Sequence, residues 1–442
     1  MHCNYICMVS YFFILETYII TVYDQGKYST FSFISNTLYI GGGEIMKFST
    51  ARKYRIYPTN EQIQIIERTF GACRYVWNKM VEAVNYQYDN HLPITIPNYG
   101  DIAVNTDWLM DKSIKLDRHS TNNTKTFFKQ SFIKCMKRFK EKKEFRKDGK
   151  PKGFPRFKSR KIDKNSFTNY HKDQVILDFK THTLKLNCMN GLVSFNKREK
   201  PIPSDWKIKN YTISRKANKY YCSICFEYED NDPLLKPLNE KQLPNAIECY
   251  LGLDYKSNGL YMDSNGNLAN YPKYYRNSQK RLRILQKKYS RQQKGSKNHE
   301  KTRLKIQQLH DHISNQRRDF LHKLSTAITK QYDVVCVEDL DMKAMSQCLR
   351  LGKSTFDNGF GMFRLMLFYK CLRKPFKALI RVPKQFASTQ TCSHCRRRQL
   401  YNLSLSDRVY SCQYCGLVID RDLNAAINIR NYGFRMINGN LF

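Results

Sequence analysis

The sequence predicts a multidomain protein that combines α/β and β domains with a helical domain. Its 442 residues fit two to four domains of about 150 residues each. Short segments of strand character separated by turns run from residue 166 to residue 228, whereas strands alternate with helices from residue 250 onward. The first pattern is typical of a β domain and the second of an α/β sheet.

The composition favours a folded protein that binds nucleic acid. Hydrophobic residues make up 41% of the chain and aromatic residues 13%, which excludes a mainly disordered protein. The net charge of +38 would cause strong self-repulsion unless a polyanion offset it, so nucleic acid is the favoured partner. The 15 cysteines are mostly single and scattered, which favours a reducing cytosol over secretion.

Residues 1–45 differ from the rest, since they hold one basic and three acidic residues. Residues 5–23 are largely apolar, but Glu16 would cost about 2.5 kcal/mol or more at a bilayer centre. A signal peptide also needs a basic region, and none precedes Tyr5. The glycine-rich run before Met46 is instead what a translated ribosome-binding site would give. We therefore predict that residues 1–45 are a non-native extension, that Met46 is the start, and that no membrane is involved.

A strand and a group of helices are expected next. Residues 48–57 alternate as a strand does and end at Pro58, after which Thr59 or Asn60 caps a helix. Apolar residues recur along this helix at steps of three and four, a spacing that predicts core packing: Ile63, Ile66, Phe70, Cys73, Trp77 and Met80. Further helices are expected to about residue 143.

A basic segment separates these helices from the strands. Residues 134–161 hold fourteen Lys and Arg against three acidic residues, with Pro and Gly near the end, so we expect a loop that contacts phosphate rather than a solvated linker. Strands are expected at 175–179, 183–186, 211–215 and 220–228. Cys222 and Cys225 lie in the last one, where they would point to opposite faces, so packing is favoured over metal binding. Residues 231–244 are expected to form a linker.

The α/β part begins with an apolar strand, residues 250–254, followed by two turn signals that predict a three-stranded meander. Residues 273–330 hold seventeen Lys and Arg against three acidic residues and are expected to form a helical hairpin broken at Gly295-Ser296. A buried strand ending at Glu338, a helix from Phe356 to about Lys374 and a strand at 378–382 follow.

Four cysteines have the spacing of a structural zinc site. Cys392 and Cys395 form one CxxC unit, and after sixteen residues Cys412 and Cys415 form another. Four thiolates on two knuckles suit one tetrahedral Zn²⁺ with no open position, so this metal is not expected to be catalytic. His394 lies inside the first knuckle and is a less favoured ligand.

Three acidic residues occupy unusual positions: two end buried strands, where a carboxylate is costly, and one begins a helix. Asp254 and Glu338 end apolar strands, and Asp422 opens a helix. Converging carboxylates are the hard oxygen ligands that two Mg²⁺ ions need for phosphodiester cleavage. Each position alone also suits a helix cap or an ion pair. Asp420 is the competing neighbour of Asp422, and lesser candidates are expected in turns or at the surface: Asp263, Asp339 and Asp341.

These motifs together resemble the TnpB family of insertion-sequence transposons. The resemblance rests on Leu-Gly-Leu-Asp254, Val-Glu338-Asp-Leu, the four-cysteine ribbon and the run from Asp420 to Ile429 (Asp-Arg-Asp-Leu-Asn-Ala-Ala-Ile-Asn-Ile). Further blocks agree at 54–58, 70–78, 154–160, 315–323 and 363–370, so the resemblance spans residues 46–432.

The resemblance implies an RNA-guided DNA endonuclease related to the small type V CRISPR nucleases. It implies an RNase H-like (RuvC) domain at 249–386 and 419–442, with Asp254, Glu338 and Asp422 as the catalytic acids on two Mg²⁺ ions, for which Mn²⁺ substitutes. It also implies a zinc ribbon at 387–418, a wedge-like β-barrel from 46–58 and 150–232, and a helical recognition domain at 59–149.

The implied partners are a guide RNA from the transposon end and double-stranded target DNA, and the implied place is the bacterial cytoplasm, at the nucleoid. Two alternatives stay open: a transposase that acts on transposon ends with the same acids, and a nuclease-dead guided repressor. Two residues depart from the family pattern. Tyr255 stands where a smaller residue is common and is expected to crowd the metal site, and Arg396 follows the first CxxC where Gly is usual.

Overall fold

The computed structural model describes residues 46–97, 107–111, 113–160, 165–170, 175–186, 189–230, 241–342, 344–345, 352–372, 374, 376–400 and 407–439. It also describes two short strands, β1 (Cys7–Met8) and β2 (Thr21–Val22). The predictions for residues 1–45 otherwise lie outside the described residues. The chain divides into two compact units, centred on Phe33–Asn231 and Asp232–Phe442, and their boundary falls at the start of the expected linker.

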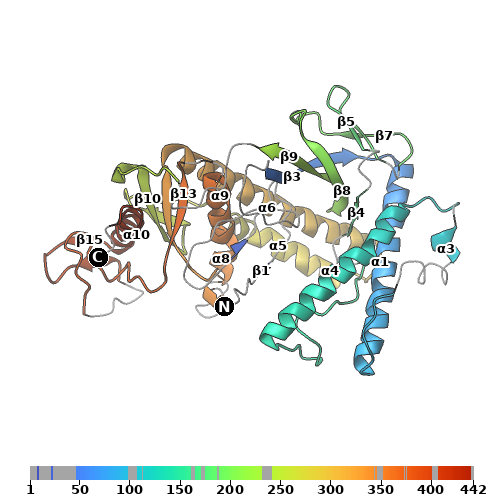
Figure 1. Cartoon of the computed structure of the whole chain (residues 1–442), viewed down its shortest axis with the longest axis horizontal. Coiled ribbons are helices and arrows are strands. Elements are labelled where there is room, and N and C mark those ends of the chain that lie inside the picture. Colours follow the sequence, from blue (N-terminus) through green and yellow to red (C-terminus); the bar gives the residue numbers. More distant parts are fainter. Residues whose placement is uncertain are drawn as a thin grey trace. The chain divides into compact units, whose positions relative to one another are not determined.

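The first unit contains a seven-stranded antiparallel sheet (Figure 1). The order of its strands across the sheet is β4-β8-β9-β3-β7-β6-β5. The strands are β3 (Met46–Tyr57), β4 (Asn165–Asn169), β5 (Ile176–Asp178), β6 (Thr183–Lys185), β7 (Leu192–Phe195), β8 (Lys207–Lys216) and β9 (Lys219–Asp230). Cys222 is fully buried and Cys225 lies on the other face of β9, so these two cysteines point to opposite faces as expected.

The closed barrel implied by the resemblance is not found, because the described strands form an open sheet with β4 and β5 at its edges. Strand β3 pairs with β9 along eleven residues, from Met46 to Ile56. It pairs with β7 only through Ile56 and Tyr57 at its far end. Strands β5 to β7 therefore extend the sheet beyond the end of β3 and do not return to β4.

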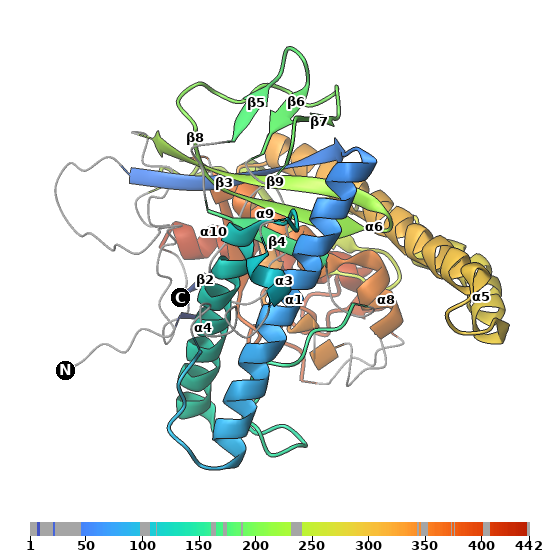
Figure 2. The same cartoon turned by 90° about the vertical axis from the view of Figure 1, so that its right-hand side faces the viewer.

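Two long helices pack beside this sheet, α1 (Asn60–Asp89) and α4 (Arg118–Lys142), which run side by side (Figure 2). A short helix, α3 (Asp107–Met110), lies between them in the sequence. Thr59 caps α1 as predicted: its side chain accepts from the N–H of Gln62, whose side chain accepts from the N–H of Thr59.

The basic segment is only partly a loop, since α4 includes its first nine residues. The rest is anchored to α1, because the indole N–H of Trp77 donates to the backbone oxygen of Arg156 at 2.9 Å. The ammonium of Lys158 lies 3.5 Å from the Trp77 ring centroid, and Phe154 is buried. Trp77 of α1 and the buried Phe154 thus fix the loop in place, which leaves cationic side chains on an ordered support.

The second unit contains a four-stranded sheet in the order β11-β10-β12-β13. The parallel strands β10 (Tyr250–Tyr255), β12 (Val334–Glu338) and β13 (Ala378–Val382) are joined by antiparallel β11 (Tyr261–Asp263). The expected third strand of the meander is reduced to an isolated bridge between Met262 and Leu268.

Helices cover both faces of this sheet. Leu251, Leu253 and Val335 belong to a core with α6 (Lys297–Gln331) and α9 (Phe360–Leu372). On the other face, Cys336 and Ile380 belong to a core with Ile429 of α10 (Arg421–Ile437). A sheet with helices on both faces buries its strands completely, which explains their continuous apolar runs.

The predicted basic hairpin is present. Helix α5 (Tyr274–Arg291) is followed by α6, with Gly295 at a φ of +89° and Ser296 capping α6 between them. The prediction of a single helix from Phe356 is wrong, because Gly359 has a φ of +66° and separates α8 (Gly352–Asn358) from α9. A left-handed residue interrupts helical hydrogen bonding. No helix of the described residues is long and apolar enough to cross a membrane.

Candidate nuclease site and cysteine cluster

Two of the three predicted acids are neighbours at one edge of the second sheet. Strands β10 and β12 run parallel, with Leu253 opposite Val337. Asp254 and Glu338, the next residue on each strand, therefore lie side by side at the carboxyl ends of adjacent strands. This edge is where parallel α/β sheets hold their ligands. The sheet register alone therefore brings together two residues that are 84 positions apart in the chain.

Helix α10 brings the third acid to the same place through an unusually close contact with β10. A Cβ added at Gly252 would lie 2.0 Å from the backbone oxygen of Ala426 and 2.7 Å from the nitrogen of Arg430. Only glycine allows this approach. Asp254 is on the same face of β10 two residues later, and Asp422 is one helical turn before Ala426. The contact at Gly252 thus places Asp422 beside Asp254.

The electrostatics place Glu338 and Asp422 close enough to Asp254 to affect its ionisation. Asp254 is 7% exposed, and burial raises its pKa well above the usual range. The charges of Glu338 and Asp422 raise this pKa further, while Arg421 and Lys256 oppose the shift. Burial also raises the pKa of Glu338, against the effect of a hydrogen bond that its Oε1 accepts from the hydroxyl of Ser388.

Asp420 and Asp422 have different surroundings. One oxygen of Asp420 accepts from the backbone N–H groups of Asp422 and Leu423, at 2.9 and 3.0 Å, so Asp420 is the N-cap of α10. The helix therefore begins one residue earlier than predicted. Asp422 is 9% exposed, and its Oδ2 lies 2.7 Å from the ammonium of Lys256. Asp420 has a structural partner within its own helix, whereas Asp422 faces the other acids.

The lesser acidic candidates have structural partners. Asp263 accepts from the backbone N–H groups of Asn265 and Asn267 in a turn. Asp339 lies 3.7 Å from Arg364 and 3.9 Å from Arg381, and Asp341 accepts from the N–H of Ala344. These contacts agree with the turn and surface roles expected for them.

Tyr255 does not crowd the three acids, contrary to expectation. Its hydroxyl accepts from the side-chain N–H of Asn358, and its ring packs against Phe360 at 4.8 Å. Because successive strand residues point to opposite faces, Tyr255 enters the α9 core while Asp254 faces α10.

The three carboxylates suit a divalent cation. The carboxylates of Glu338 and Asp422 both oppose the ionisation of Asp254, so the three form a hard oxygen donor set in which a cation would offset repulsion. The three carboxylates are less tightly gathered than the thiols of the four cysteines. Among the described residues, these cysteines are the one group of three or more Cys, His, Asp or Glu side chains that has the geometry of a metal site.

The four cysteines form a compact group whose sulfur atoms all lie within 4.8 Å of one another. Two pairs, Cys392 with Cys415 and Cys395 with Cys412, are 3.6 Å apart, far longer than a disulfide bond of about 2.05 Å. Four sulfurs about 2.3 Å from a tetrahedral Zn²⁺ would be separated by about 3.8 Å, so the group fits zinc. His394 is not part of it.

Two of the four thiols differ in acidity: burial raises the pKa of Cys392 to about 12, whereas Cys412 is poised to be a thiolate. Burial alone would raise the pKa of Cys412, but hydrogen bonds from the N–H groups of Tyr414 and Cys415 and from two neighbouring thiols bring it down to about 6. Two short strands, β14 (Val409–Ser411) and β15 (Val418–Asp420), join this group to α10.

Sequence analysis missed the residues that connect the cysteine cluster to the acids. Asn424 and Asn428, both buried on α10, donate to the backbone oxygen of Thr391 at 2.8 and 2.6 Å. Asn424 also accepts from the N–H of Ser393 at 2.9 Å. The signal was a pair of asparagines four residues apart on an otherwise apolar helix face. Lys256 and Ser388, which contact the acids, had no such signal.

Three family models match parts of the chain. One described as "Probable transposase" matches residues 223–349, and "Cas12f1-like, TNB domain" matches residues 360–429. A third, "Helix-turn-helix domain", matches residues 46–92, which here form β3 and the single long helix α1.

Curated relatives match almost the whole chain. "Putative RNA-guided DNA endonuclease InsQ" of Escherichia coli (strain K12) is 30% identical over 410 residues, covering 89% of this chain and 94% of the relative. "Putative RNA-guided DNA endonuclease" of Streptomyces pristinaespiralis is 28% identical over 396 residues, covering 86% and 88%.

Among solved structures, a Cas12f1–sgRNA–target DNA complex matches with 14% identity and a TM-score of 0.47, covering 84% of this chain and 83% of that one. The sequence identity to InsQ over nearly the full length of both proteins decides the assignment. This chain belongs to the TnpB family of insertion-sequence proteins.

Proposed function

We propose that this protein is an RNA-guided DNA endonuclease of an insertion-sequence transposon. It hydrolyses phosphodiester bonds of DNA with Asp254, Glu338 and Asp422 as its catalytic acids. The observation that carries the proposal is that three separate elements bring these acids together: burial raises the pKa of Asp254, and the charges of Glu338 and Asp422 raise it further. Perturbed acids at the carboxyl edge of a parallel sheet are typical of functional sites. The names of the relatives from Escherichia coli and Streptomyces pristinaespiralis, RNA-guided DNA endonucleases, support this proposal.

We assign the domains as the resemblance implies, except that the wedge is an open sheet. The nuclease domain, RNase H-like in this proposal, covers 249–386 and 419–442, with the zinc ribbon at 387–418. The wedge comprises 46–58 and 150–232, and the recognition helices comprise 59–149. The unit boundary at Asn231 supports the division between wedge and nuclease.

The three carboxylates would hold two Mg²⁺ ions, or Mn²⁺ in their place. Bound there, the ions would lower the pKa of a water and stabilise the leaving oxygen. Ser388 orients the Glu338 carboxylate through its hydrogen bond. Lys256, which is paired with Asp422 and still 26% exposed, lies where its ammonium can meet a phosphate oxygen of DNA.

The guide RNA and target DNA would lie on the two basic segments, residues 134–161 and the hairpin α5–α6. Guided nucleases hold a heteroduplex by its backbone while base pairing supplies the sequence. Closely spaced cations on ordered elements suit that task, because phosphate contacts carry most of the affinity.

Guided cleavage assays with matched variants test the site. Glu338→Gln and Asp422→Asn should each lower the cleavage rate by orders of magnitude while guided DNA binding persists, because they remove ligand charge and leave the basic segments intact. The double variant should cost little more than either change alone. Asp420→Asn is the control and should keep clear activity, since Asp420 only caps α10. An inactive Asp420→Asn beside an active Asp422→Asn would reverse the assignment.

A transposase that cuts transposon ends is the second candidate, favoured by the description of the family model over residues 223–349. RNA that co-purifies with the protein and directs cleavage supports the guided nuclease. Cleavage of transposon ends without RNA supports the transposase, and guided binding without cleavage in Mg²⁺ would support a repressor.

A further inference from the structure

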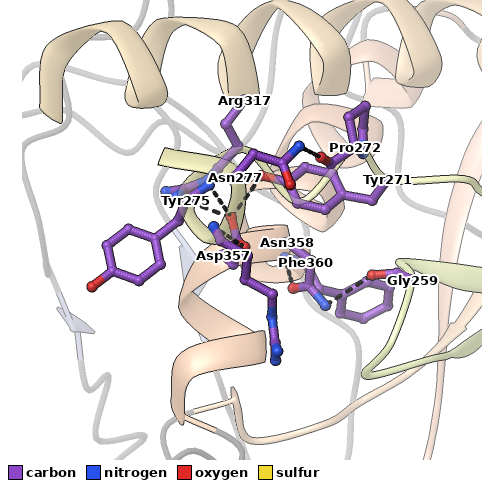
Figure 3. Close-up of polar contacts among 10 residues, drawn as sticks. Gly259, Tyr271, Pro272, Tyr275, Asn277, Arg317, Asp357, Asn358 and Phe360 are labelled. Carbon is purple, nitrogen blue, oxygen red and sulfur yellow. Dashed lines mark hydrogen bonds and ion pairs between the residues drawn. The ribbon is translucent and has the colours of Figure 1, made fainter. Parts of the chain in front are cut away.

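A buried acid outside the candidate nuclease site sits at the base of the basic hairpin. Asp357, the next-to-last residue of α8, is 3% exposed (Figure 3). It accepts from the backbone N–H groups of Tyr275 and Arg276, at 3.0 and 3.2 Å, and from the hydroxyl of Tyr271 at 3.2 Å. Arg317 of α6 lies 3.9 Å away. One carboxylate thus contacts both helices of the hairpin.

Asp357 supplies the N-terminal cap that α5 lacks in its own sequence. The residue before α5, Lys273, has a φ of +53° and makes no side-chain cap. The first turn of a helix has unpaired N–H groups and a partial positive charge, which a carboxylate satisfies. Burial raises the pKa of Tyr271 to about 12, so its hydroxyl stays protonated and can donate to this carboxylate. The start of α5 therefore depends on a residue about 80 positions further along the chain.

The next residue, Asn358, forms hydrogen bonds at the end of β10, the strand that carries Asp254. Asn358 is 2% exposed and donates to the hydroxyl of Tyr255 at 3.2 Å. It also donates to the backbone oxygen of Gly259 at 3.1 Å (Figure 3). Tyr255 directly follows Asp254, and Gly259 lies in the turn between β10 and β11. The peptide 357–358 thus holds the hairpin with one side chain and the end of β10 with the other.

The chain beyond this peptide fixes it against the hairpin. Gly359 has a φ of +66°, and a Cβ added there would lie 3.0 Å from the Cδ of Arg317. The oxygen of the Asn358 side chain accepts from the N–H of Phe360, which starts α9. Small displacements of the hairpin base would therefore be carried to residues 357–359 and to the end of β10.

We propose that Asp357 and Asn358 are positioning residues that couple nucleic acid bound on the hairpin α5–α6 to the placement of Asp254. The inference rests on the proposed function for its catalytic consequence. The hairpin is long and strongly basic, while its base is joined by hydrogen bonds, through Asp357 and Asn358, to the strand that carries Asp254.

Hydrogen–deuterium exchange of the full chain tests the coupling without cleavage. The probe is an RNA–DNA heteroduplex of about 20 base pairs and arbitrary sequence. Binding should slow exchange at the start of α5 and also at residues 250–262. Asp357→Asn should still bind the heteroduplex, because the exposed cations are unchanged, but should lose the added protection at 250–262. Equal protection of 250–262 in the variant and the unmodified chain would overturn the proposal.

Two further variants separate coupling from general loss of stability. Tyr255→Phe removes only the hydroxyl that Asn358 contacts, so it should weaken protection at 250–262 without unfolding the hairpin. Asp319→Asn makes the same charge change on α6 at an exposed site paired with Lys323, and it should behave as the unmodified chain. If Asp319→Asn loses protection as Asp357→Asn does, charge alone explains the effect and the coupling is refuted.

Cleavage in the same variants tests the catalytic consequence. With the RNA that co-purifies with the chain and saturating matched double-stranded DNA, Asp357→Asn should lower the single-turnover rate on the order of a hundredfold. It should also raise the Mg²⁺ concentration needed for half of that rate, because a displaced Asp254 loses ligand geometry. An unchanged Mg²⁺ requirement would refute positioning of Asp254. If the unmodified chain cleaves nothing, the proposed function fails, whereas the exchange experiment still decides the coupling.

Discussion

At the level of one residue, burying the carboxyl group of Asp254 in the candidate site lowers the stability of the fold at neutral pH. Its pKa is raised by burial first and by Glu338 and Asp422 second, so the folded state holds its proton more tightly than the unfolded state does. Stability from this group is fully present below the ordinary pKa of about 3.9 and is lost as pH rises through the raised value. At neutral pH the fold has therefore lost stability from this group that it has below about pH 3.9.

We therefore predict that Asp254→Asn raises the melting temperature of the protein without Mg²⁺, and that the gain is larger at about pH 8 than at about pH 5. Thermal unfolding at both pH values measures it, with the zinc left in place. Asp420→Ala should instead lower the melting temperature, because it removes the side-chain oxygen that caps α10. A lower melting temperature for Asp254→Asn at about pH 8 would contradict the assigned cause of the shift.

At the level of elements, the contact between β10 and α10 assembles the site. Gly252→Ala would force α10 outward, because the new Cβ would lie 2.0 Å from the oxygen of Ala426. Overpacking of this kind typically costs about 1–3 kcal/mol. We expect that loss in chemical denaturation and a larger loss in cleavage, since Asp422 moves with the helix.

Gly361→Ala is the matched control for this prediction. Its added Cβ would lie 4.0 Å from the nearest atom, a side-chain carbon of Met342, within helix α9. Alanine is favoured over glycine in a helix by about 1 kcal/mol, so this variant should be neutral or more stable. Equal stability losses in the two variants would show that the β10–α10 contact is not special.

The cysteine cluster gives a second prediction at this level. Cys412→Ser should remove about one zinc per chain and destabilise the second unit, because zinc binding contributes folding free energy. Elemental analysis and thermal unfolding measure both effects. An unmodified protein that purifies without zinc would refute the site.

The two knuckles differ in the residue that follows each CxxC. Gly416 has a φ of +72°, and Arg396 takes the same left-handed conformation with a φ of +66°. Glycine adopts this conformation without strain, whereas other residues pay about 1 kcal/mol. Arg396→Gly should therefore bind zinc at least as tightly as the unmodified chain, as competition with a chelator would show, and weaker binding would contradict this account.

At the level of the whole molecule, the charge of +38 is concentrated where nucleic acid is proposed to bind. Arg283 and Lys287 are exposed and one turn apart on α5. Replacing both by Ala should weaken heteroduplex binding and lower the slope of log affinity against log salt by about one for each lost phosphate contact. Lys79→Ala, whose charge is already matched by Glu82 at 2.9 Å, is the control. An unchanged salt slope in the double variant would place the nucleic acid elsewhere.

The sequence by itself determined the features that depend on neighbouring residues. The capping box at Thr59, the break at Gly295-Ser296 and the CxxC spacing each lie within a few positions, so local chemistry specifies them. The acids at the ends of apolar strands were also identified from sequence, because a carboxylate in that position is costly without a partner.

Only the tertiary structure decided the features that depend on distant contacts. The different surroundings of Asp420 and Asp422 depend on where α10 meets β10, and the open sheet depends on how far β3 extends past β7. Asn358 bonds to the hydroxyl of Tyr255 from 103 positions further along the chain, and Asp357 caps a helix that begins 83 positions before it. Such contacts join elements far apart in the chain, and local sequence patterns carry no signal for them.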